Sequence, residues 1–173
     1  MFEDKQSNAA ENIASHAIDL ASEKREEYQV CILHRLLGNI YRSKGEKEKA
    51  IHHFETALGI ASPSNWHNEL FWINYSLAIF FCNYAEFDNA NIYIEQAKSH
   101  TINGHDEHNL GRATELQAKV WYQQLRLKDT KSEALWACEI YEKLGAVNDV
   151  GYCRDLLQEV ERDTKNRVIG FEG

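Results

Sequence analysis

The residues best suited to metal chemistry lie together in one short segment, SHTINGHDEH, at positions 99–108. Imidazole and carboxylate groups are adequate ligands for zinc or nickel, and the segment carries His100, His105, Asp106 and His108. No cysteine joins them, and Asn103-Gly104 predicts a flexible turn among them. A polar connection with an acidic residue near the start of the next helix explains the same composition. We favour that interpretation and expect no metal ion and no cofactor.

Other residues with catalytic chemistry form no known arrangement. No serine or cysteine lies in a strand-turn-helix elbow, and the sequence contains neither HExxH nor a glycine-rich phosphate loop. Carboxylate pairs such as Glu26-Glu27 fall on polar helix faces, where charges are normally only solvated. His52 and His53 are neighbours on a predicted helix and should point apart. We therefore expect the protein not to be an enzyme.

Composition and charge argue against several classes of partner. The net charge is -8 at pH 7, and no stretch clusters Lys and Arg, which disfavours nucleic acid. No run approaches about 18 apolar residues, and the start, MFEDKQSN, lacks the pattern of a secretory signal, so we expect no membrane partner and no export. Free thiols in a cytoplasmic protein are favoured by four cysteines without a CxxC pair, namely Cys31, Cys82, Cys138 and Cys153.

The elements that position these residues are predicted to be helices. A single proline in 173 residues favours an all-α fold, because proline costs about 3 kcal/mol inside a helix. Small residues at Gly38 and Ala50 would let two helices cross at the short end of about 8–10 Å, and Gly45 would end the first of them in a left-handed conformation. A helix-turn-helix repeat of about 34 residues is predicted by the run Cys31, Leu37, Gly38, Tyr41, Gly45, Ala50, Phe54, Ala57 and Pro63.

The repeat recurs twice with wider spacing. A second copy starts near Phe71, 40 positions after Cys31, so residues 64–70 are predicted to form an extended loop or an early helical turn. In a third copy, extra residues at 127–131 are predicted to lengthen the second helix by one turn. We predict an α-solenoid in one domain, with repeats at 31–64, 71–104 and 111–145, a lone N-terminal helix at 8–23 and a capping helix at 147–163.

These motifs resemble the tetratricopeptide repeat (TPR) superfamily over roughly residues 31–157. Longer stretches, such as HFETALGIASPSNWHNELFWINYSLA and SEALWACEIYEKLGAVNDVGYCRDLL, are similar to repeats of large fungal proteins of the STAND class. In those proteins such repeats form the C-terminal sensor or scaffold behind a NACHT or NB-ARC nucleotide-binding module. This chain contains no GxxxxGK(S/T) phosphate loop, so the resemblance does not extend to NTPase activity.

Stacked helix pairs curve, and the first helix of each pair is expected to line a concave groove. The mixture of cations, amides and aromatic rings at the groove positions suits an extended or helical peptide with some acidic character. The residues predicted to face the groove are Ile32, Arg35, Asn39 and Arg42 in the first copy, Trp72, Tyr75, Ile79 and Cys82 in the second, and Arg112, Glu115, Lys119 and Tyr122 in the third.

A narrower hypothesis is the carboxylate clamp with which some TPR cochaperones hold the acidic C-terminus of heat-shock chaperones. Arg35, Asn39 and Arg112 match three positions of that clamp. Ser76 and Leu116 stand where the clamp has an amide and a cation, so the match is incomplete.

We expect a protein–protein interaction scaffold that binds a protein or peptide partner in the groove. Two alternatives remain open: a structural homo-oligomerisation module, and a sensor or regulatory fragment of a STAND-type NTPase. The apolar helix face at Ile13 and Ala17 and the apolar tail Val168-Ile169-Gly170-Phe171 suggest a homodimer.

Overall fold

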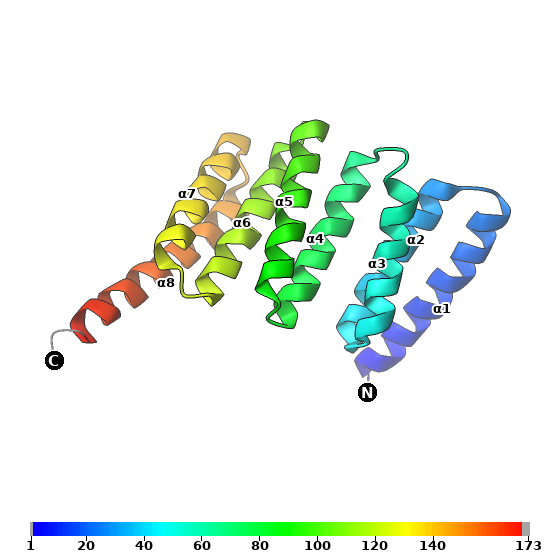
Figure 1. Cartoon of the computed structure of the whole chain (residues 1–173), viewed down its shortest axis with the longest axis horizontal. Helices are drawn as coiled ribbons and strands as arrows, with labels where there is room; N and C mark the ends of the chain where they lie inside the picture. The colour runs from blue at the N-terminus through cyan, green and yellow to red at the C-terminus, as the bar shows by residue number, and fades with distance from the viewer. Residues whose placement is uncertain (1, 171–173) are drawn as a thin grey trace.

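The computed structural model describes residues 2–170, with side chains from residue 8 to residue 167, and this part of the chain is all-helical without strands. The helices follow one another in a row with α1 and α8 at opposite ends, which confirms the predicted α-solenoid (Figure 1). None of the helices in residues 2–170 is long and apolar enough to cross a membrane. The elements are α1 (Phe2–Glu23), α2 (Glu27–Lys44), α3 (Lys47–Ala61), α4 (His67–Asn83), α5 (Phe87–Gly104), α6 (Glu107–Gln123), α7 (Leu127–Leu144) and α8 (Val147–Gly170).

The repeat period is 40 residues throughout, and the expected 34-residue pattern is wrong in this respect. The first helices α2, α4, α6 and α8 begin at positions 27, 67, 107 and 147, and the second helices α3, α5 and α7 begin at 47, 87 and 127. The predicted extended loop at 64–70 is also wrong, because α4 already begins at His67 after the short connection 62–66. Longer helices account for most of the wider period, since α5 and α7 each have 18 residues and α3 has 15.

Small residues allow the two helices of a pair to pack closely, as the sequence predicted. A Cβ atom on Gly38 of α2 would lie 2.6 Å from the ring of Phe54 on α3. In the third pair, a Cβ atom on Gly111 of α6 would lie 2.7 Å from the ring of Tyr141 on α7. Ala50 is fully buried beside the first of these contacts. Both crossings therefore have no space for a larger side chain.

The turns between helices share one backbone feature. A residue with positive φ occurs once every 20 residues, from position 25 to position 145. Gly45 and Gly145 adopt this conformation without strain, and Gly45 ends α2 as predicted. The other five turns hold Arg25, Asn65, Ala85, His105 and Leu125. A non-glycine residue in this region costs about 1–2 kcal/mol, so helix packing on both sides imposes the turn.

The row of helices bends so that the first helices lie on its inner side. The backbones of α2 and α4, of α4 and α6, and of α6 and α8 come into contact. Within residues 2–170 no such contact joins one second helix to the next, nor α1 to α3. First helices are therefore more closely spaced than second helices, which is the geometry of a curved array with the first helices inside. In this register α1 takes the place of a second helix and α8 the place of a first helix.

Candidate partner-binding face

The residues predicted to line a groove lie on α2, α4 and α6, at positions that repeat every 40 residues. We call this surface and its continuation on α8 the inner face. The predicted residues are all half-buried except Lys119, which is exposed. Four further members on α8 were not predicted from the sequence, although the 40-residue spacing carries the signal for them: Tyr152, Asp155, Glu159 and Arg162.

A buried ion pair joins α2 to α4 at the inner face. Nε of Arg35 lies 3.0 Å from Oε2 of Glu69, whose residue is 3% exposed, and Tyr28 donates a hydrogen bond to the same carboxylate at 3.4 Å. Nδ2 of Asn39 donates to Oγ of Ser76 at 3.3 Å. Arg35 and Asn39 therefore hold the two helices together, and neither can engage the carboxylate of a clamp ligand without loss of a contact inside the fold.

Aromatic side chains dominate the contribution of α4. The ring of Tyr75 stacks on Phe71 with the centroids 5.5 Å apart, and Trp72 meets both rings edge-on. The guanidinium of Arg112 on α6 lies 5.4 Å from the ring of Trp72, which is the geometry of a cation–π contact. Burial raises the pKa of Tyr75 to about 12, so its hydroxyl stays neutral near pH 7. The centre of the inner face is thus apolar, with one hydroxyl group.

On α6 most charges are already paired. Lys119 forms an ion pair with Glu115 one helical turn earlier, and Glu115 also accepts a hydrogen bond from Tyr141 of α7 at 3.0 Å. Tyr122 donates to Asp163 of α8 at 2.7 Å, and this hydrogen bond raises the pKa of Tyr122. A neutral tyrosine does not cancel the charge of that carboxylate. The acidic character of the inner face therefore increases from α6 to α8.

Arg42 differs from the other cations of the inner face. It is half-buried on α2, and its Nε donates to Oδ1 of Asn39 at 3.3 Å. Among residues 8–167 no carboxylate forms an ion pair with it. Burial lowers the pKa of Arg42, because a desolvated cation without a counter-charge is disfavoured. An anionic group of a ligand would supply the missing partner.

The structure separates the residues of the proposed metal segment. His100 faces His67, His105 takes the left-handed turn position, and His108 lies 3.3 Å from Asp149. Asp106 caps α6 by accepting a hydrogen bond from the backbone N–H of Asn109 at 2.9 Å, as the alternative interpretation predicts. The turn expected at Asn103-Gly104 is wrong, because both residues complete α5. No group of three or more His, Cys, Asp or Glu residues in the described part of the chain could hold a metal ion.

Two histidine pairs link the first and second helices of a repeat instead. Nδ1 of His34 lies 2.9 Å from Nδ1 of His53, and the His53 ring stacks on Tyr41. A second pair, His67 and His100, has the same atoms 3.5 Å apart. Burial, together with the neighbouring His34, lowers the pKa of His53 to about 4. Each pair needs at least one neutral ring, so these histidines serve packing rather than ligand binding.

The cysteines are free thiols, and Cys31, Cys138 and Cys153 are buried. Burial raises the pKa of Cys31 and of Cys82 to about 11 and that of Cys153 to about 12. The thiolate is the nucleophilic form, so these groups are poor nucleophiles near neutral pH.

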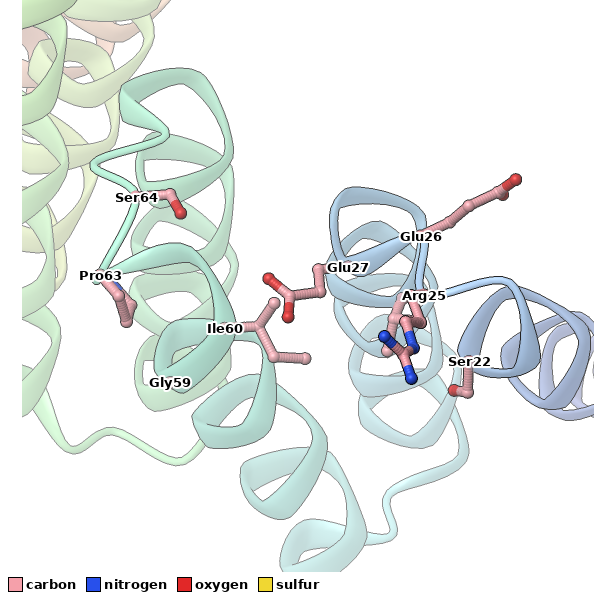
Figure 2. Close-up of a pocket in the computed structure, with 9 residues that line it drawn as sticks. Ser22, Arg25, Glu26, Glu27, Gly59, Ile60, Pro63 and Ser64 are labelled. Atoms are coloured by element: carbon pink, nitrogen blue, oxygen red, sulfur yellow. The ribbon is translucent and has the colours of Figure 1, made fainter.

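Two clefts lie away from the inner face. One of about 620 Å³ is bounded by the α1–α2 turn, the start of α2 and the end of α3, and Figure 2 shows Glu27 and Ile60 facing each other across it. The early end of α3 at Ala61 opens this space. The other, of about 720 Å³, lies between the start of α7 and the last turns of α8. Neither is lined by a residue that the sequence predicted for the groove.

Comparison with known proteins defines the class. No protein-family model matches the chain, and no curated protein matches its sequence. Among solved structures, BtubC (BKLC) from P. vanneervenii is similar with a TM-score of 0.70 and 16% identity, over 92% of this chain and 75% of that one. Aspartyl phosphate phosphatase F from Bacillus subtilis is similar with a TM-score of 0.61 and 15% identity, over 91% of this chain and 44% of that one. The chain therefore has a helical-repeat fold in common with these proteins and spans less than half of the second.

Proposed function

We propose that this chain is a TPR-type scaffold without enzymatic activity, which binds a peptide or a helix of a protein partner on its inner face. The observation that carries the proposal is Arg42, a half-buried cation without a counter-charge, next to the apolar patch of Trp72, Tyr75 and Ile79. Aromatic anchors beside a charged hydrogen-bond donor are the residue types that dominate binding energy at protein interfaces.

The absence of enzymatic activity is part of the proposal. It is supported by the separation of the candidate metal ligands and by the raised pKa of the cysteine thiols. A cytoplasmic location belongs to the same proposal, because free thiols persist in a reducing compartment.

A peptide-display selection against the purified chain tests the proposed function. Peptides that bind the wild type should lose most of their affinity for Ile79→Asp, because that substitution puts a carboxylate into the apolar patch. Ile92→Asp is the matched control, since Ile92 is 54% exposed on the second helix α5. Equal binding by wild type and Ile79→Asp, or failure to select any peptide, would contradict binding at the inner face.

A homo-oligomerisation module is a second candidate, and the exposed face of α1 supports it. Ile13 is 71% exposed and Leu20 is 46% exposed, because no first helix covers α1 in this structure. A second copy that packs on this face would bury both side chains. Light scattering of the wild type and of Ile13→Glu/Leu20→Glu distinguishes the cases: a dimer mass that falls to 20.0 kDa only in the variant supports this candidate.

A further inference from the structure

Unpaired charge on the inner face is distributed unequally between its two ends. On α2 the inner-face residues carry only positive charge, from Arg35 and Arg42. The buried Glu69 neutralises Arg35, so Arg42 is the cation of α2 that remains available. The end of the inner face that α2 forms is therefore positively charged.

The opposite end is acidic. On α8, Asp155 and Glu159 occupy the inner-face positions that Arg35 and Asn39 hold on α2. Both carboxylates are exposed, and no ion pair involves either of them within residues 8–167. Asp163, whose partner is the neutral hydroxyl of Tyr122, adds a third negative charge beside them. Arg162 is the one opposing cation, so negative charge predominates.

Between these ends the inner face has little free charge. The apolar patch on α4 is uncharged, and the Glu115–Lys119 pair on α6 is internally balanced. Arg112 is the exception, and its guanidinium lies over the ring of Trp72. The sequence of surfaces from α2 to α8 is therefore positive, apolar, nearly balanced and negative.

We propose that the inner face binds a peptide segment with segregated charges in one fixed orientation, its acidic end at Arg42 and its basic end at Asp155 and Glu159. This inference rests on the proposed function. The apolar middle of the segment packs on Trp72 and Ile79. Three steps between adjacent helices of about 8–10 Å each span roughly 24–30 Å, which an extended chain covers with about eight or nine residues. Opposite charges about that far apart in a partner sequence are the recognition signal.

Fluorescence anisotropy with labelled nine-residue peptides tests the proposal. One peptide has two aspartates, then a leucine- and phenylalanine-containing middle, then two lysines, and the other has the same composition with its charges alternating. We expect roughly tenfold tighter binding of the segregated peptide, because two or three favourable pairs replace mixed ones. The preference should weaken as salt is raised.

Charge reversal locates the two ends of the peptide. Arg42→Glu should weaken binding of the segregated peptide, and replacing its aspartates by lysines should restore affinity for this variant. Asp155→Lys/Glu159→Lys should behave in the mirror sense with the basic end. Lys143→Glu and Glu139→Lys are the matched controls, since both residues are exposed on the second helix α7. Circular dichroism verifies that each variant is folded.

The outcomes separate the two levels of the proposal. Equal affinity for the segregated and alternating peptides, with binding still abolished by Ile79→Asp, overturns the fixed orientation and leaves the proposed function intact. Absence of binding by both peptides and by an uncharged peptide with the same apolar middle contradicts the proposed function itself. Tighter binding of the segregated peptide that Arg42→Glu does not weaken places the acidic end elsewhere and also overturns the inference.

Discussion

Two glycines at equivalent positions of successive repeats should respond in opposite directions to the same substitution. Gly111 on α6 and Gly151 on α8 are 40 residues apart. Replacing glycine by alanine inside an exposed helix stabilises it by about 1 kcal/mol, because alanine loses less backbone entropy on folding. A Cβ atom on Gly151 would meet nothing within 4 Å, so this gain should appear undiminished.

At Gly111 the new methyl group collides with the neighbouring helix. Its Cβ would lie 2.7 Å from Cε1 and 3.1 Å from Cδ1 and Cζ of Tyr141. That ring cannot move easily, because it is fully buried and its hydroxyl donates to Glu115. Overpacking costs about 1–3 kcal/mol and a strained hydrogen bond about 1 kcal/mol more. After the helix gain of about 1 kcal/mol is subtracted, Gly111→Ala should be destabilised by about 1–3 kcal/mol.

Thermal and urea denaturation followed by far-UV circular dichroism measure both effects. For a chain of this size we expect Gly151→Ala to raise the midpoint by about 2–4 °C and Gly111→Ala to lower it by about 2–10 °C. Stabilisation by Gly111→Ala would falsify the close crossing of α6 and α7. A destabilised Gly151→Ala variant would mean that another element or a partner covers α8.

Three further predictions concern pH, a turn and a buried ion pair. Because burial places the folded-state pKa of His53 near 4, below the unfolded value of about 6.5, stability should be fully present above pH 6.5 and fall as the pH drops towards 4. Urea titrations at several pH values should record that slope, and His53→Gln should flatten it. Leu125→Gly should stabilise the protein by about 0.5 kcal/mol, since it relieves a positive φ of 60° at an exposed residue at the cost of unfolded-state entropy; a lowered midpoint would contradict this. Arg35→Ala should destabilise by about 3 kcal/mol by leaving Glu69 buried without its cation, and Arg35→Met/Glu69→Leu should recover most of the loss; equal losses in both variants would refute the argument.

Much of the architecture could be predicted from local patterns. Recurring small residues such as Gly38 and Ala50, and a turn glycine such as Gly45, predict paired helices because their effects act over one or two turns of chain. The predicted period failed for a related reason. Left-handed turns at Ala85 and Leu125 carry no glycine, so the sequence gives no sign that a helix ends there.

The candidate site shows the same division. Periodicity alone predicted that Arg35, Arg42 and Tyr75 share one surface, and the 40-residue register extends that surface to Asp155 on α8. Which of these charges remain available could not be read from the sequence. That depends on partners such as Glu69, 34 residues from Arg35 along the chain, and on which helix lies next to which.

The sequence by itself determined that this chain forms helices, that they pair, and which face of each first helix turns inward, because side-chain size and spacing act locally. Only the tertiary structure decided which charges cancel, since ion pairing depends on distances between atoms of different helices. It thereby left Arg42 without a counter-charge at one end of the inner face and Asp155 and Glu159 unpaired at the other.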